Sequence, residues 1–183
     1  MDSDGINVFE IYKEEIAQIE RLTPGEREAA FLNSMAGDVS AQKTLANDFL
    51  PDVVDISRLY LDQGVPVEEL VSQGNEALVE GVKLLAPFSD REEAESALVR
   101  MIMNAMEDLI EEEGRERESA GKIADQVNEV ADAATAYFEE TGRDADMAAL
   151  AEKTGFDESY IRDAQRMSGN RIAHLEKTDG SAS

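Results

Sequence analysis

Few residues in this chain have the types and spacing that catalysis needs. His174 is the only histidine and there is no cysteine, so neither a histidine dyad nor a histidine or thiolate metal site is expected. The many carboxylates fall on solvent-facing positions and are interpreted as a solvated surface. No phosphate-binding glycine loop, nucleophile elbow or EF-hand loop is present. The sequence therefore predicts a protein that is not an enzyme, without catalytic residues, metal or cofactor.

The residues that suggest binding lie in the stretch 64–82, which reads GVPVEELVSQGNEALVEGV. Its apolar residues recur at three- and four-residue steps and predict one buried helical face, formed by Val67, Leu70, Val71, Leu78 and Val82. The other face carries an unbroken polar run, 72–75, preceded by two glutamates. Within it, Gly74 destabilises a helix by roughly 1 kcal/mol relative to alanine. This glycine indicates a kink, a close helix contact or another role unrelated to helix stability.

The composition restricts the class of protein and of partner. The net charge is −24, from 17 basic and 41 acidic residues, and such a field opposes non-specific binding to nucleic acid. The apolar fraction of 42% suffices for a core, which must be mostly aliphatic because aromatic residues make up only 5%. The acidic N-terminus is unlike a signal peptide, and no apolar run approaches the length of a membrane span. We therefore expect a cytoplasmic protein that does not bind membranes.

The elements that position these residues are predicted to be helices. Helical periodicity runs through nearly every segment and no stretch alternates as a strand would, which indicates an all-α fold. The first helix is expected over 6–19, and capping boxes at 23–26 and 89–92 mark two later helix starts. Pro51 is expected to break or bend the helix that contains it. Residues predicted to face the core include Ile11, Ile16, Ala29, Phe31 and Leu32, while Leu59, Leu61 and Ile123 are among the apolar residues that mark later helices.

A charged stretch divides the chain. Residues 111–121, EEEGRERESAG, have no apolar side chain larger than alanine and are interpreted as a linker or an exposed helix extension. The boundary predicted there separates a domain over 1–113 from a smaller helical domain over 114–170. A loose polar tail, 171–183, is expected to follow and to leave its histidine exposed.

Two short helices of the smaller domain are expected to meet at Gly155, each opened by an aspartate. Leu150 and Ile161 would fill the corner between them, which is the spacing of a helix-turn-helix. A DNA-recognition role is one interpretation. However, Asp157 and Glu158 place two carboxylates where base contacts would be made, which favours a packing unit.

The order of these signals resembles the bacterial RNA polymerase sigma-70 family, from region 1.2 to region 3, over roughly residues 7–175. The segments that carry the resemblance are LTPGE at 22–26, GDVSA at 37–41, RLY and GVP within 58–66, ELVSQGN at 69–75 and TGRDADMAALAEKTGFDESYIRDA at 141–164. The resemblance implies a multi-helix region 2-like domain followed by a small three-helix region 3-like domain. In function it implies transcription initiation or its regulation.

In that family the helix matching 69–75 docks on the clamp helices of the RNA polymerase largest subunit. Carried over by residue, the resemblance implies that Glu69, Ser72, Gln73 and Asn75 bind RNA polymerase core. Ser72 is the weaker match because the family usually has glutamine there. Gln73 keeps polarity but lacks the family's charge. The resemblance also implies that Gly74 belongs to this docking face and permits close approach of the partner.

The segment resembling the family's promoter-melting helix departs much further. The family's base-stacking aromatics fall on Ala97, Arg100 and Met101, and its basic positions on Met103 and Asp108. Each lost stacking platform forfeits about 1–3 kcal/mol per base. Residues 88–118 carry eleven acidic and four basic side chains, a local net charge of −7. Binding of promoter DNA is therefore doubtful.

Weak DNA contacts are assigned to Arg100, Asn104, Lys122 and Asp125, of which the last two partly match a family His/Glu pair. The 183 residues end before the family's domain that reads the promoter minus-thirty-five element, so a complete sigma factor is not expected from them. Two alternatives stay open. One is a divergent sigma factor that recognises promoters, and the other is a helical protein-interaction module without a role in transcription.

Overall fold

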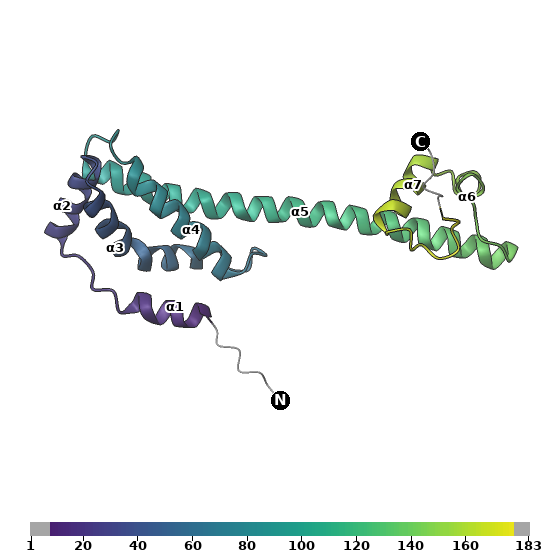
Figure 1. The fold of residues 1–183 in the computed structure, drawn as a ribbon, viewed down its shortest axis with the longest axis horizontal. Helices are drawn as coiled ribbons and strands as arrows, with labels where there is room; N and C mark the ends of the chain where they lie inside the picture. The colour runs from purple at the N-terminus through teal and green to yellow at the C-terminus, as the bar shows by residue number, and fades with distance from the viewer. Residues whose placement is uncertain (1–7, 178–183) are drawn as a thin grey trace, which may run out of the picture. The chain divides into compact units, whose positions relative to one another are not determined.

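The computed structural model describes residues 8–177, and within them the predicted all-α class is confirmed (Figure 1). The elements are α1 (Val8–Ala17), α2 (Pro24–Met35), α3 (Val39–Ser57), η1 (Arg58–Tyr60), α4 (Val67–Gly81), η2 (Val82–Leu84), α5 (Arg91–Thr141), α6 (Met147–Thr154) and α7 (Glu158–Met167). The described residues hold no strand, only an isolated bridge between Ala145 and Leu175. Ile6 of the predicted first helix and residues 178–183 of the predicted tail lie outside the described residues.

The chain divides into two compact units, residues up to Gly114 and residues from Arg115 onward. The helix α5 is continuous through this division, so the charged stretch 111–121 is helical and its side chains are almost all exposed. No helix in the described range is long and apolar enough to cross a membrane.

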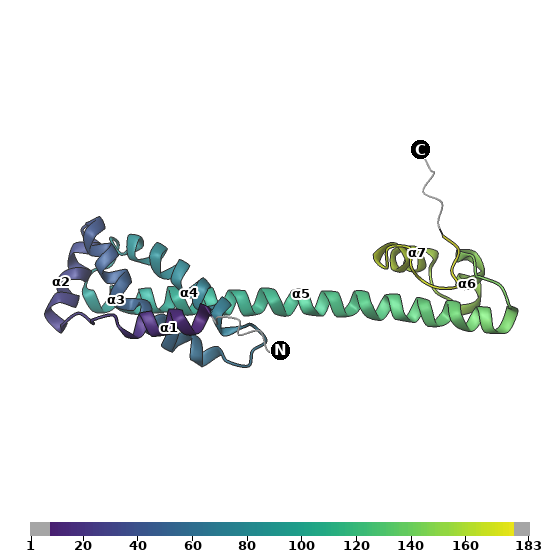
Figure 2. The same ribbon diagram turned by 60° about the horizontal axis from the view of Figure 1, so that its bottom comes forward.

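The first unit packs α2, α3 and α4 against the N-terminal part of α5 (Figures 1 and 2). Phe31 and Phe49 meet edge to face, with their ring centroids 5.8 Å apart, and both are buried. Aliphatic side chains with no exposed surface surround them, namely Leu45, Val53, Leu70, Leu78, Leu85, Leu98 and Ile102. Each buried leucine or isoleucine of this kind contributes roughly 1.5–3 kcal/mol. The core is aliphatic, as the low aromatic content requires.

Local capping starts the helices that frame this core. The predicted box at Thr23 is confirmed, since Glu26 N donates to Thr23 Oγ1 and Glu26 Oε2 accepts from Thr23 N at 2.9 Å. The second predicted box is displaced by one residue. Asp90 is the cap of α5 and accepts from Glu93 N at 2.9 Å, while the Glu93 carboxylate accepts from Ser89 N at 3.0 Å. The carboxylates of Asp90 and Glu93 are both stabilised by the positive end of the helix dipole.

Several residues predicted to be buried are exposed. On α2 the buried residues are Ala30, Phe31 and Ser34, a 3.6-residue face that excludes Ala29 and Leu32. The predictions for Ile11 and Leu32 were wrong, since these side chains are 44% and 50% exposed. Other apolar residues that marked the predicted helices are also 41–68% exposed, namely Leu59, Leu61 and Ile123. Hydrophobicity identified apolar residues there, but the face that meets a neighbour is set by packing.

Pro51 lies inside α3 and does not break the helix, so of the two predicted effects the break does not occur. A proline deprives the carbonyl four residues earlier of its donor. That residue is Asn47, which is exposed, so water can take the vacant hydrogen bond. The long α3 therefore continues to Ser57.

Tyr60 links the end of α3 to α5. Its ring is 7% exposed and its hydroxyl donates to Glu107 Oε1 at 2.8 Å. Burial first, then the hydrogen bond and charge of Glu107, raise the pKa of Tyr60 from 10.0 to about 12. The folded state thus holds the Tyr60 proton more tightly than the unfolded state does.

This pKa shift gives a testable dependence of stability on pH. Because the folded pKa lies above the unfolded one, the contribution of the neutral hydroxyl is complete below pH 10 and falls as pH rises toward 12. We expect the difference in unfolding free energy between wild type and Tyr60→Phe to be constant from pH 8 to 10 and to shrink above pH 10. Urea unfolding followed by circular dichroism measures it. A difference in unfolding free energy that stays constant up to pH 11.5 would contradict the raised pKa of Tyr60.

The second unit packs α6 and α7 on the C-terminal part of α5 (Figures 1 and 2). As predicted, Leu150 and Ile161 are buried, and Gly155 takes the turn between the two short helices with a φ of +78°.

The predicted loose tail is wrong for its described part. Ile172 and Leu175 are buried in the core of the second unit. Ala145 N donates to His174 O and Glu176 N donates to Ala145 O, both at 2.9 Å, so two backbone bonds hold this segment beside the α5–α6 loop. The two aliphatic side chains explain the packing, since leaving both in water would lose their burial energy.

Candidate functional site

The helix α4 presents one exposed stripe of side chains. Its opposite face is buried as predicted, with Leu70 and Leu78 fully inaccessible. The stripe consists of Glu69, Ser72, Glu76, Val79 and, in η2, Lys83, all exposed and spaced by three or four residues. We call this set the α4 stripe. Only its first two members were predicted, because a motif is contiguous in sequence whereas a helical face is not.

Gly74 lies on the buried face of α4 and not on the stripe. A Cβ built on it would lie 2.4 Å from Met106 Cε and 2.7 Å from Val53 Cγ1. The glycine therefore allows α4 to approach α3 and α5 within the first unit. Its interpretation as part of a docking surface was wrong, and the close helix contact is the correct one.

The four predicted polymerase-binding residues point in three directions. Glu69 and Ser72 are exposed on the stripe. Gln73 is half-buried at the edge of α4 that faces α5, in a small pocket of about 170 Å³ with Asp108. Asn75 is half-buried, and its Nδ2 donates to the Tyr12 hydroxyl of α1 at 2.7 Å. Asn75 thus has a structural partner within the unit.

The weak DNA candidates all lie on α5, but in different units. Arg100 and Asn104 are exposed in the first unit. Lys122 and Asp125 are exposed in the second, where Lys122 pairs with Glu118 at 2.7 Å. The four candidates therefore form two pairs, one in each unit.

Ala97, which matches a stacking aromatic of the family, has a packing role in the structure. Ala97 is only 4% exposed, so its side chain faces the interior of the first unit and not solvent. Met101 is half-buried as well. This face of α5 serves packing.

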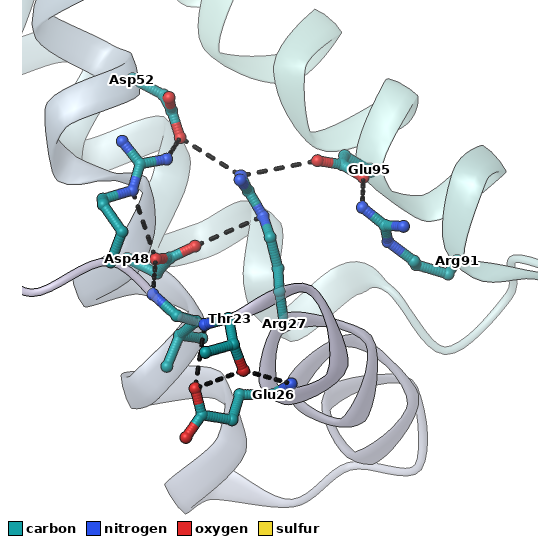
Figure 3. A network of polar contacts seen from close by, with 9 residues as sticks. Thr23, Glu26, Arg27, Asp48, Asp52, Arg91 and Glu95 are labelled. Carbon is teal, nitrogen blue, oxygen red and sulfur yellow. Dashed lines mark hydrogen bonds and ion pairs between the residues drawn. The ribbon is translucent and has the colours of Figure 1, made fainter.

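A polar network that the sequence did not reveal lies between α2, α3 and α5 (Figure 3). At its centre Asp48 is 2% exposed, accepts a hydrogen bond from Leu22 N at 2.8 Å and faces the Nε atoms of Arg21 and Arg27 at 3.3 Å. The Arg27 guanidinium also stacks on the Phe49 ring, 4.4 Å from its centroid.

With its outer residues included, the network contains equal numbers of positive and negative side chains. Asp52 Oδ2 lies 2.7 Å from Arg21 Nη2 and 3.2 Å from Arg27 Nη2, and Glu95 connects Arg27 to Arg91. Three guanidinium groups thus face three carboxylates, which indicates a structural role and not proton transfer. Across residues 8–177, no group of three or more histidine, cysteine or acidic side chains is placed to hold a metal ion.

His174, the only histidine, is half-buried and engaged. Its ring stacks on Phe138 with the centroids 3.9 Å apart, and its Nδ1 lies 3.0 Å from Asp144 Oδ1. The prediction of an exposed tail residue is corrected by this packing. The single carboxylate partner positions the ring, and the described surroundings hold no nucleophile in hydrogen-bond contact with it.

An open groove of about 670 Å³ lies beside the C-terminal half of α4. Its walls come from the segment between α1 and α2, from α3, and from α4 with η2, and half of its fourteen lining residues are aliphatic. We call it the α3–α4 groove. Val79 and Lys83 belong both to this groove and to the α4 stripe.

The candidate site is a surface feature of the first unit. Its parts are an exposed polar stripe and a neighbouring apolar groove on the first unit. No protein-family model matches this chain, and a comparison with curated proteins finds no match either.

Proposed function

We propose that this protein is sigma-70-like, with a region 2-like unit and a region 3-like unit, and that it docks on RNA polymerase core through α4. Its role lies in transcription initiation or its regulation, with promoter DNA read poorly or not at all. The contact is with the clamp helices of the largest subunit, as the resemblance of residues 69–75 implies.

The observation that carries the proposal is the contrast between two helices of the first unit. The outward side of α4 keeps exposed polar side chains at the positions that resemble the docking motif, Glu69 and Ser72. By contrast, α5 buries Ala97 where a stacking side chain would be needed, in a segment, 88–118, of net charge −7. The helix α4 therefore supports binding of a protein partner, whereas α5 argues against binding of promoter DNA.

The charge of α4 also favours a protein partner over DNA. Glu69, Glu76 and Glu80 are all exposed on α4, so the helix presents negative potential to a partner. Such a surface favours a basic protein patch and accelerates its association, whereas it repels phosphate. A partner protein therefore fits this face better than nucleic acid does.

Reversal of the charge at Glu69 tests the proposal. We expect Glu69→Lys to weaken binding to RNA polymerase core at least tenfold, about 1.4 kcal/mol, because it places a cation against a basic partner surface. Binding of purified full-length chain to immobilised core enzyme, at several salt concentrations, measures this. Glu28→Lys is the matched control, since it reverses an exposed carboxylate on α2 of the same unit. Wild-type protein that fails to bind core enzyme overturns the proposal.

A second candidate, a divergent sigma factor that recognises promoters, is favoured by one observation. Arg100 and Asn104 are exposed one helical turn apart on α5, and Arg100 has no ion pair among the described residues. Run-off transcription with core enzyme separates the two functions. A promoter-specific transcript supports the second candidate, and binding without a transcript supports the first.

A further inference from the structure

The α3–α4 groove has the character of a protein-binding surface. Its floor is made by Ile19, Leu22, Leu50 and Val82, which come from three separate segments of the first unit. At its rim, Val39 is 62% exposed and Val79 is 46% exposed. The chain has a net charge of −24, so a cluster of aliphatic side chains on its surface is unusual for this protein. Contiguous exposed apolar surface of this kind marks interaction sites.

Two of the six lysines of the chain line the same groove, Lys43 on α3 and Lys83 on η2. Lys43 is exposed and has no carboxylate partner among residues 8–177. Lys83 pairs with Glu80 at 2.7 Å, but both side chains are more than half exposed, so the pair is weak and can be exchanged.

Two acidic residues also line the groove, one of them exposed. Asp48 lines the groove but is already paired with Arg21 and Arg27 on its other side. Glu20 is the remaining charged lining residue and is exposed. Lys43 is therefore the cation of the groove that a partner carboxylate can meet next to the apolar floor.

The groove continues the α4 stripe. From Glu69 the stripe passes through Glu76 to Val79, ten residues along one helix, which is about 15 Å at 1.5 Å per residue. One end of this surface is acidic, and the other end is apolar with lysines beside it. A single helix of about three turns is long enough to touch both ends.

We infer that the α3–α4 groove is the second half of the docking surface and takes an amphipathic helix of the partner protein. Aliphatic side chains of that helix fill the groove, an acidic side chain meets Lys43, and basic side chains meet Glu69 and Glu76. The inference rests on the proposed function, and the partner is the same RNA polymerase core.

The experiment measures binding of full-length variants to core RNA polymerase. We expect Val79→Asp and Lys43→Glu each to weaken binding at least tenfold. Both positions are exposed, so the fold should persist, which circular dichroism and thermal unfolding verify. Leu59→Asp and Arg58→Glu are matched controls, since they make the same changes of charge at exposed η1 positions that do not line the groove, and should bind within twofold of wild type.

The outcomes separate this inference from the proposed function. If wild-type chain does not bind core enzyme, both are overturned. If wild type binds and Glu69→Lys weakens it while Val79→Asp and Lys43→Glu bind like wild type, the groove inference alone is overturned. If both groove variants weaken binding and the controls do not, the two-part surface is supported.

Discussion

Replacement of Asp48 by alanine is expected to destabilise the first unit by about 3 kcal/mol. The substitution removes the acceptor of Leu22 N and one of the two carboxylates that face Arg21 and Arg27 (Figure 3). Arg27 is only 21% exposed, so its guanidinium cannot recover full hydration. The value lies at the lower end of the range for a broken buried ion pair because Asp52 still pairs with both arginines.

Urea unfolding of the full chain, followed by circular dichroism, measures this loss. Asp55→Ala is the control, since Asp55 pairs with Arg58 on the surface, where the side chains are 66% and 62% exposed, and its loss should be below about 1 kcal/mol. Asp48→Asn should fall between the two because its amide oxygen can still accept from Leu22 N. Equal midpoints for Asp48→Ala and Asp55→Ala would show that the network contributes no stability.

The same network shows where prediction from the sequence ends. Local signals predicted what lies close along the chain, such as the capping box at Thr23 and the buried face of α4, because a helix turn is specified by residues three and four apart. The burial of Asp48 depends on partners more than twenty residues away. An aspartate in a helix that carries two other aspartates gives no local sign of that pairing.

The candidate site was likewise predictable from the sequence only in part. Residues 69–75 were chosen as a contiguous motif, but consecutive helical residues point in different directions, so only Glu69 and Ser72 face outward. Steps of three and four residues from Glu69 would have identified Glu76 and Val79 without a structure. The groove could not have been found in this way, because its walls are three segments brought together by tertiary packing.

The described C-terminal segment was missed for a different reason. Ile172 and Leu175 are two aliphatic residues in an otherwise polar stretch, too few to show a periodicity. Their burial follows from the space that α5, α6 and α7 leave in the second unit. Composition alone indicated a loose tail, and packing decided otherwise.

Replacement of Gly74 by leucine is expected to destabilise the first unit by about 3 kcal/mol, the upper part of the range for overpacked cores. Even a Cβ at this position would lie 2.7 Å from Val53 Cγ1, and the branched Val53 cannot turn away as the flexible end of Met106 can. The rest of a leucine side chain would have to separate α4 from α3 and α5. Urea unfolding should show a lower midpoint than wild type.

Gly114→Ala is the matched control for this experiment. It also replaces a helical glycine, on α5, but its Cβ would meet nothing within 4 Å, so helix propensity should raise stability by up to about 1 kcal/mol. Opposite signs for the two substitutions would assign Gly74 to internal packing, whereas a Gly74→Leu chain as stable as wild type would contradict it. Because Gly74 is buried behind the α4 stripe, any loss of polymerase binding in Gly74→Leu should follow the loss of folded protein. Glu69→Lys and Val79→Asp should instead lose binding with their thermal midpoints unchanged, which separates the contact surface from the packing that supports it.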